Sequence, residues 1–271
     1  MDEQRTTTSA RRLPAAAALL VGAILAGGIA GGGIATAVVN TTSGTATSAA
    51  SPAPATTVSV DSSSTESAVV DVVNGSLPAV VTIRSTVRGA FGQTGTGSGS
   101  GFIYDSRGLI LTNHHVIDGA TALTVILADG TEYDGTVVGS DASLDLAVVR
   151  IGATGLPTLA LATGDARIGQ SVIAIGTALG QYDLSVTTGV VSGVNRTLTA
   201  SNGPARGHGE ALSGALQHDA ALNPGDSGGP LLDLAGNVIG VNTAVAGNAQ
   251  GIAFAVPISH AADLIAEARS A

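Results

Sequence analysis

The sequence contains no cysteine among its 271 residues. This absence excludes disulfide bonds, a thiolate nucleophile and metal sites with sulfur ligands. It leaves the cellular compartment open, because many exported domains fold without disulfides. A segment of about 200 residues buries an adequate core unaided, so the chain could hold one large or two small domains.

Charged residues are scarce, at 11% of the chain against roughly 25% in typical soluble proteins. All eleven basic residues are arginine, and surface polarity must come mostly from Ser, Thr, Asn and Gly. From Glu66 onward, eight arginines and seventeen acidic residues give a net charge of −9. Such a region repels phosphate backbones, so no nucleic-acid partner is expected.

The segment Leu13–Val39 carries no charged residue. As a helix it would extend over about 40 Å, against a bilayer core of roughly 30 Å, so it predicts a single transmembrane signal anchor. Arginines within residues 1–12 precede it, and no charge follows until Asp61. The positive-inside rule then places residues 1–12 in the cytoplasm and everything after the anchor outside the cell membrane.

A cleaved signal peptide is the alternative, because Ala35-Thr36-Ala37 resembles a small-residue cleavage site, and the protein would then be secreted. The next stretch, residues 40–65, is nearly all Ser, Thr, Ala, Val, Gly and Pro. It cannot bury enough apolar area to offset its ordering entropy, so it predicts a disordered linker.

The region 66–271 consists of short apolar runs separated by turn residues. Many short strands of this kind predict an all-β protein, either a sandwich or barrels. Two stretches are helical in pattern, Ser67–Val73 and Ser259–Arg269, with Ser259 as the expected cap of the second. The strands are expected at Ala79–Arg84, Gly101–Tyr104, Gly108–Thr112, Ala122–Ala128, Thr131–Gly139, Asp145–Ile151, Leu159–Leu161, Ser171–Gly176, Leu184–Val194, Ala215–Asp219, Leu231–Leu232, Val238–Thr243 and Ile252–Val256.

Near the end of the chain, Ser227 stands among glycines in the run NPGDSGGP. Glycines let the backbone turn sharply there and direct N–H groups toward an oxyanion, which suits a nucleophilic serine. Serine is a weak nucleophile at neutral pH and needs a base, usually a histidine that a carboxylate orients. This motif alone therefore requires a histidine and an acid elsewhere in the chain.

The run LTNHHVI supplies two adjacent candidates, His114 and His115. On an extended segment neighbours point to opposite faces, so at most one of them can face a given site. Asp145 begins a strongly apolar run, where an unpaired carboxylate would be costly, so it is expected to have a partner. Asp141 competes with it weakly and fits a surface turn.

These segments resemble the motifs of trypsin-like serine proteases of the HtrA/Deg family. TNHHV, DASLDLAVVRI and NPGDSGGPLL occur in the family's order, and the resemblance extends over about residues 67–257. It implies two six-stranded antiparallel β-barrels, about 66–155 and 156–257, followed by the helix at 259–269. It also implies a serine endopeptidase that acts through an acyl-enzyme on misfolded or exported proteins.

The family pattern assigns His115 as general base, Asp145 as orienting acid and Ser227 as nucleophile, and leaves His114 at a variable position. An oxyanion hole is expected from the N–H groups of Gly225 and Ser227, with that of Asp226 nearby. No cofactor and no metal are expected, because His208, His218 and His260 form no ligand pattern. An uncharged S1 pocket that prefers small or medium aliphatic P1 residues is expected from Ala221, Leu222, Ala244, Val245 and Ile252.

Two alternatives remain for the activity. Gly225–Gly229 also fits the nucleophile elbow of α/β-hydrolases, but only His260 follows the serine, and it lies in the expected terminal helix. A catalytically silent protease-like binding or scaffold module is the second alternative, although all three triad residues are present.

Two departures from the family pattern concern regulation. Asp226 stands where much of the HtrA family has Asn; in digestive relatives this Asp receives a new N-terminus after zymogen cleavage. The hypothesis here is that a neighbouring hydrogen bond or an Arg holds Asp226 and that no activation cut is needed. The PDZ domains of typical family members are not expected after Ala271, and a homo-oligomer stays possible.

Overall fold

The computed structural model describes residues 62–89, 92–177, 184–199, 211–245 and 251–271. The predicted anchor Leu13–Val39 and nearly all of the predicted linker lie outside these ranges. Among the described residues, no helix has the length and apolarity needed to cross a membrane.

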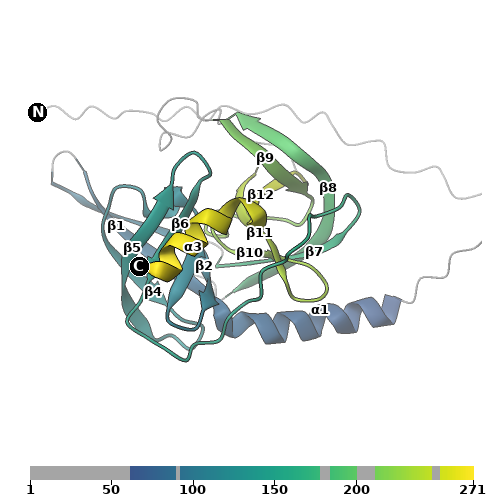
Figure 1. Ribbon diagram of the computed structural model, residues 1–271, viewed down its shortest axis with the longest axis horizontal. Coiled ribbons are helices and arrows are strands. Elements are labelled where there is room, and N and C mark those ends of the chain that lie inside the picture. Colours follow the sequence, from purple (N-terminus) through teal and green to yellow (C-terminus); the bar gives the residue numbers. More distant parts are fainter. Residues whose placement is uncertain (1–61, 90–91, 178–183, 200–210, 246–250) are drawn as a thin grey trace, which may run out of the picture. The chain divides into compact units, whose positions relative to one another are not determined.

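Six strands close the first barrel in the order β1-β2-β3-β6-β5-β4, with every neighbouring pair antiparallel (Figure 1). Alternate apolar side chains from its strands point inward and fill its interior, as the alternating patterns predict. The strands are β1 (Val80–Arg88), β2 (Thr94–Asp105), β3 (Leu109–Thr112), β4 (Ala120–Ile126), β5 (Glu132–Asp141) and β6 (Leu146–Arg150).

Six further strands close the second barrel in the order β10-β11-β12-β9-β8-β7, again antiparallel throughout. Its interior holds a separate apolar cluster that includes Val172, Val191, Leu231 and Ile239. The strands are β7 (Ser171–Gly176), β8 (Ser185–Thr199), β9 (Ala211–His218), β10 (Pro230–Leu232), β11 (Val238–Val245) and β12 (Ala253–Pro257).

A third cluster of buried residues joins the two barrels. It contains Phe102 and Leu111 from the first barrel and Ile173 and Val241 from the second, and all four are fully buried. The barrels therefore share one apolar interface, and functional groups at the ends of facing strands are held in a fixed relation.

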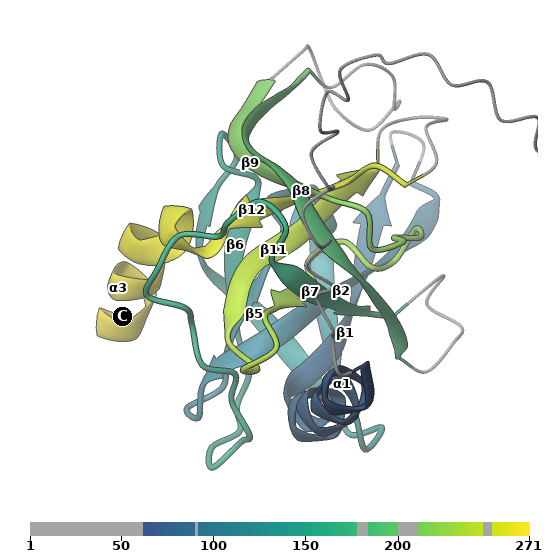
Figure 2. The same ribbon diagram turned by 90° about the vertical axis from the view of Figure 1, so that its right-hand side faces the viewer.

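Helices connect to this core at both ends of the described chain. Helix α1 (Ser62–Ser76) and the turn η1 (Leu77–Ala79) lead into β1, and Val69, Val72 and Val73 pack against the shared cluster. After β12, the turn η3 (Ile258–Ala261) and helix α3 (Ala262–Ser270) return to the first barrel, where α3 packs on β5 and β6 (Figures 1 and 2).

Contacts at the end of α3 tie the second barrel to the first. Leu264 is buried, and its side chain lies so close to Gly139 that a Cβ there would approach it to 2.9 Å. The Arg150 guanidinium donates to the Ala268 carbonyl at 3.1 Å. Arg269 lies 3.5 Å from the Asp105 carboxylate and stacks over the Tyr104 ring at 5.5 Å from its centroid.

The predicted fold of two six-stranded antiparallel barrels with a C-terminal helix is confirmed, with three local corrections. Leu159–Leu161 is not a strand, because it forms only a single bridge, from Leu161 to Val238. The cap predicted at Ser259 is wrong: α3 begins after Ala261, which makes no side-chain cap bond. Helix α1 is longer than predicted and begins at Ser62.

Candidate active site

The histidine doublet lies on one turn of helix rather than on an extended segment. Strand β3 ends at Thr112, and α2 (His114–Ile117) follows after Asn113. The turn forms because Val116 and Ile117 are buried in the first barrel, and Val116 packs onto Gly99 so closely that a Cβ at Gly99 would lie 2.6 Å from it. The glycine-rich start of β2 thus makes room for the turn that positions His115.

Asp145 lies at the mouth of β6 and is almost fully buried, at 4% exposed. Its backbone φ of +55° is a left-handed conformation that Asp tolerates better than most residues. The Asn113 side-chain amide donates to the Asp145 carbonyl at 2.9 Å, which holds this turn in place. The carboxylate is thereby aimed at α2.

The predicted partner of this buried carboxylate is His115. The ring atom Nδ1 lies 2.9 Å from both carboxylate oxygens, and the backbone N–H of His115 donates to Oδ1 at 3.0 Å. An ionised carboxylate only accepts hydrogen bonds, so Nδ1 carries the proton and the neutral ring has Nε2 as its basic atom. His114 does not take part in this arrangement, and its Nδ1 is buried with no partner among the described residues.

Ser227 lies on a tight turn that two glycines allow. Gly225 and Gly228 have φ values of +104° and +89°, which favour glycine. A Cβ on Gly228 would come within 2.1 Å of the Ser100 carbonyl, so no larger residue fits between the barrels here. The Ser227 hydroxyl donates to the Thr243 carbonyl at 3.0 Å.

Thr243 connects the residues of the two barrels, and the sequence reasoning missed it. Its hydroxyl donates to Asp145 Oδ2 at 2.5 Å, while its carbonyl accepts the Ser227 hydroxyl. It lies on β11 beside Asn242, and both polar side chains are buried, at 3% and 0% exposed. Two adjacent polar residues in an otherwise apolar strand were the available signal.

The three amides predicted for an oxyanion hole differ in their bonding. The Asp226 N–H donates to the Asn223 carbonyl at 3.0 Å, so it is occupied within the turn. The N–H groups of Gly225 and Ser227 donate to no acceptor in the part of the chain that the structure describes. Two of the three amides are thus available to an incoming oxygen.

The Asp226 side chain is buried beneath this turn, at 3% exposed. Its Oδ2 accepts the Asn223 N–H at 2.8 Å, and within the described ranges its Oδ1 has no partner and no arginine pairs with it. Burial raises the pKa of Asp226 above its ordinary value, and the bond from Asn223 opposes this shift.

The residues predicted to form an S1 pocket have different surroundings. Ala221 is exposed, and its carbonyl accepts the Thr187 hydroxyl at 2.8 Å. Leu222 is partly buried against the interior of the second barrel, and Ile252 against the cluster shared by both barrels. Ala244 and Val245 belong to β11, but their side chains lie outside the described part of the chain.

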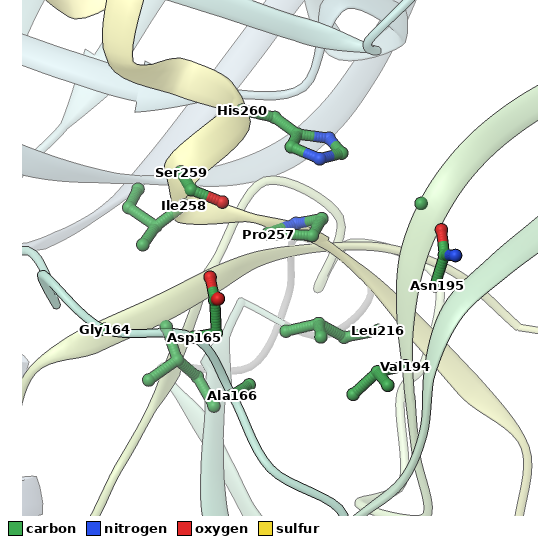
Figure 3. Close-up of a pocket in the computed structure, with 12 residues that line it drawn as sticks. Gly164, Asp165, Ala166, Val194, Asn195, Leu216, Pro257, Ile258, Ser259 and His260 are labelled. Carbon is green, nitrogen blue, oxygen red and sulfur yellow. The ribbon is translucent and has the colours of Figure 1, made fainter.

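A hollow of about 290 Å³ lies elsewhere on the second barrel (Figure 3). Leu216, Val194 and Ala166 contribute apolar atoms to it, and Asp165, Asn195 and His260 contribute polar ones. None of His115, Asp145 and Ser227 lines it, so it is separate from the candidate active site.

Comparisons with known proteins identify the family of this chain. A family model of the trypsin-like peptidase domain matches residues 99–241. Protease Do-like 1 of Arabidopsis thaliana, a chloroplast protein, is 45% identical over 168 residues, which cover 60% of this chain and 37% of that protein. The serine protease Do-like HtrA of Bacillus subtilis is 40% identical over 216 residues, covering 72% and 47% of the two chains.

Solved structures are similar as well. The HtrA-type protease AlgW with a tripeptide has 36% identity and a TM-score of 0.62, covering 73% of this chain and 62% of that one. The serine endoprotease from Yersinia pestis has 33% identity and a TM-score of 0.60, covering 73% and 65%. The present chain spans less than half the length of the two curated relatives.

The chain therefore belongs to the trypsin-like peptidase family. Within that class its strong similarity is to the HtrA/Deg serine proteases, so the predicted recognition is confirmed, and the names of these relatives agree with the predicted enzyme class of serine endopeptidase.

Proposed function

We propose that this chain hydrolyses peptide bonds with His115, Asp145 and Ser227 as a catalytic triad. The observation that carries the proposal is the partly buried contact between His115 Nδ1 and the Asp145 carboxylate, at 2.9 Å, with Thr243 linking that carboxylate to the Ser227 hydroxyl. A carboxylate held by three donors fixes the ring with Nε2 as the base, which is the protonation state that nucleophilic attack requires.

In the proposed reaction, the Ser227 hydroxyl turns from the Thr243 carbonyl and gives its proton to His115 Nε2 as Oγ attacks the scissile carbonyl carbon. The oxyanion accepts hydrogen bonds from Gly225 and Ser227 N–H. When the tetrahedral intermediate collapses, the C–N bond breaks and His115 protonates the leaving amine. Water then attacks the carbonyl carbon of the Ser227 ester while His115 Nε2 takes a proton from it. The bond between that carbon and Ser227 Oγ breaks, His115 returns the proton to Oγ, and the acid product leaves.

We infer a preference for small or medium aliphatic P1 residues. Ala221, Leu222, Ala244, Val245 and Ile252 carry no charge, and a pocket of such residues cannot pair a buried Arg or Lys. A peptide library in which the wild-type protein cleaves mainly after Arg would contradict this preference.

The proposed substrates are misfolded or exported proteins outside the cytoplasm, with Leu13–Val39 as a membrane anchor, or as a cleaved signal in a secreted form. Support comes from the charge-free length of that segment and from relatives named as periplasmic serine endoproteases, such as that of Halomonas elongata. The Asn223 hydrogen bond to Asp226 supports activity without an N-terminal activation cut. Purified uncleaved protein should therefore be active.

A fluorophosphonate probe and a peptide substrate test the proposal. Wild-type protein should be labelled, and Ser227→Ala should lose both the label and about a million-fold in turnover if the triad acts as a unit. Wild-type protein that folds, binds peptides and neither reacts nor cleaves would instead be a silent binding module. Comparing extracellular protein termini in cells with wild-type protein and with Ser227→Ala identifies the physiological substrates.

A further inference from the structure

Ser100 is a fully buried polar residue at the interface between the two barrels. It lies on β2, in the glycine-rich run before the apolar half of that strand. Its backbone N–H donates to the Ser227 carbonyl at 2.8 Å, and its own carbonyl accepts the Thr112 hydroxyl at 2.6 Å. The first barrel thus bonds directly to the backbone of the proposed nucleophile.

The Ser100 hydroxyl bonds to the same turn at a second point. It donates to the Gly225 carbonyl at 2.7 Å and accepts the Thr177 N–H at 2.8 Å. The Thr177 hydroxyl lies 3.1 Å from Ser100 Oγ and donates to the Gly99 carbonyl at 3.4 Å. Because the single hydroxyl hydrogen of Ser100 goes to Gly225, Thr177 is the donor in its contact with Ser100 and shares its hydrogen between the two acceptors. The Ser100 oxygen therefore makes three hydrogen bonds and has one possible orientation.

These bonds fix the peptide group between Gly225 and Asp226 at both ends. Ser100 holds its carbonyl, and the Asn223 carbonyl accepts its N–H at 3.0 Å. The neighbouring peptide groups carry the N–H groups of Gly225 and Ser227, the two amides that are available to an incoming oxygen. Each neighbouring peptide shares a Cα atom with the central one, so fixing the central peptide anchors the chain between these two amides.

We propose that Ser100 is a positioning residue for the oxyanion hole: its hydroxyl, set by Thr177, holds the Gly225 carbonyl so that the Gly225 and Ser227 amides converge on the reacting oxygen. The inference rests on the proposed peptide hydrolysis. Ser100 acts through the turn and does not touch the substrate. Its effect should therefore be felt in the tetrahedral intermediate and little in substrate binding.

The test compares Ser100→Ala with Ser85→Ala in the full chain. Ser85 is also a buried serine of the first barrel, on the adjacent strand β1, and makes no bond to the Gly225–Gly229 turn. Loss of a complete oxyanion donor costs about 100- to 1,000-fold in kcat, so a displaced donor in Ser100→Ala should cost about 10- to 100-fold. KM should stay within about threefold, because only the transition state uses the oxyanion hole.

A peptide boronic acid provides a readout that a merely structural role would not change. Its tetrahedral adduct with Ser227 places an oxygen in the oxyanion hole, so its affinity should fall by a factor similar to that in kcat. The affinity of a product-like peptide should stay as in wild type. Ser85→Ala should match wild type in all three measurements.

The outcomes separate the two proposals. Wild-type protein that neither cleaves peptides nor reacts with a fluorophosphonate would overturn the hydrolase proposal itself. If wild type is active, two results would overturn the role of Ser100. One is a kcat for Ser100→Ala within twofold of that for Ser85→Ala. The other is a joint loss in Ser100→Ala, with kcat and product affinity lowered and KM raised together.

If Ser100→Ala does not fold, Thr177→Val is measured in its place. This variant removes the hydroxyl that orients Ser100 but leaves the Thr177 backbone N–H in place. It should lower kcat by about two- to fivefold with unchanged KM, since one modest hydrogen bond is lost. An unchanged kcat would contradict the proposal.

Discussion

The buried imidazole of His218 makes the stability of this protein depend on pH. His218 lies on β9 with its side chain fully buried, and neither ring nitrogen makes a well-formed hydrogen bond within the described residues. Burial lowers the pKa of His218 from 6.5 to about 4, although the Asp219 carboxylate and the backbone of Phe254 and Ala220 favour the charged ring.

The size of the effect follows from this shift. Above pH 6.5 the ring is neutral in both the folded and the unfolded chain, so its contribution to stability is complete. Between pH 6.5 and about 4, the unfolded chain takes up a proton that the folded chain does not, so stability is lost as the pH falls. The difference between a pKa of 6.5 in the unfolded chain and one of about 4 in the folded chain corresponds to about 3 kcal/mol of unfolding free energy.

The assay is urea and thermal unfolding, followed by circular dichroism from pH 7 to pH 4, on wild type and His218→Leu. The wild type should lose about 3 kcal/mol relative to the variant over this range, or about 6–12 °C in Tm. Asp226, whose raised pKa makes stability fall as pH rises above its ordinary value, is present in both proteins and cancels in the difference.

Leu216→Ala is the matched control, because it also removes a buried side chain of β9 but no titratable group. Its stability should be lower than that of wild type by a similar amount at every pH. Parallel curves for wild type and His218→Leu would refute the reasoning, since they would mean that the folded and unfolded chains bind protons at His218 equally.

Three further predictions concern the active site and the terminal helix. Thr243→Val removes one of the donors to the Asp145 carboxylate and should lower kcat/KM in a peptide assay by about 10-fold or more, since a hydrogen bond to a charged group contributes about 1.5–3 kcal/mol. Thr243→Ser should retain most activity in the same assay. Equal rates for wild type and both variants would contradict the role of the hydroxyl. His115→Ala should abolish peptide cleavage whereas His114→Ala should leave most of it, and the reverse result would mean that the register of the first barrel is wrong by one residue. Leu264→Ala should lower the free energy of unfolding by about 2–4 kcal/mol in urea titrations, because it truncates a buried side chain between α3 and β5. A change below about 1 kcal/mol would show that α3 does not stabilise the barrels.

Much of the fold could be predicted because each strand carries its own alternating pattern. The run at 238–243, for example, lies within β11, and the run at 79–84 lies within β1 except for Ala79. Closure into two barrels was not contained in these local patterns and came from the family resemblance. Leu159–Leu161 was predicted incorrectly because an apolar run that bonds once to each barrel has the same local pattern as a short strand.

The candidate site could be predicted where the residue type itself indicates the chemistry. A buried carboxylate at Asp145 required a partner, and the structure supplies it in His115. Thr243 and Ser100 were not predicted, because hydroxyl residues are common in this chain. The role of each depends on which acceptor its hydroxyl reaches after folding: the Asp145 carboxylate for Thr243 and the Gly225 carbonyl for Ser100. The pair of adjacent polar residues in β11 marked Thr243 as unusual, but no local pattern in the sequence shows which groups it contacts.

The order of these residues along the chain has a consequence for biosynthesis. His115 and Asp145 come from the first barrel, whereas Ser227 and Thr243 come from the last half of the second, with Thr243 on the strand before the final one. A ribosome-bound or partly exported chain can complete its first barrel while it still lacks the nucleophile and the threonine that bonds to Asp145. In the proposed mechanism, the chain therefore cannot cleave a peptide bond before β11 has been synthesised and has packed against the first barrel.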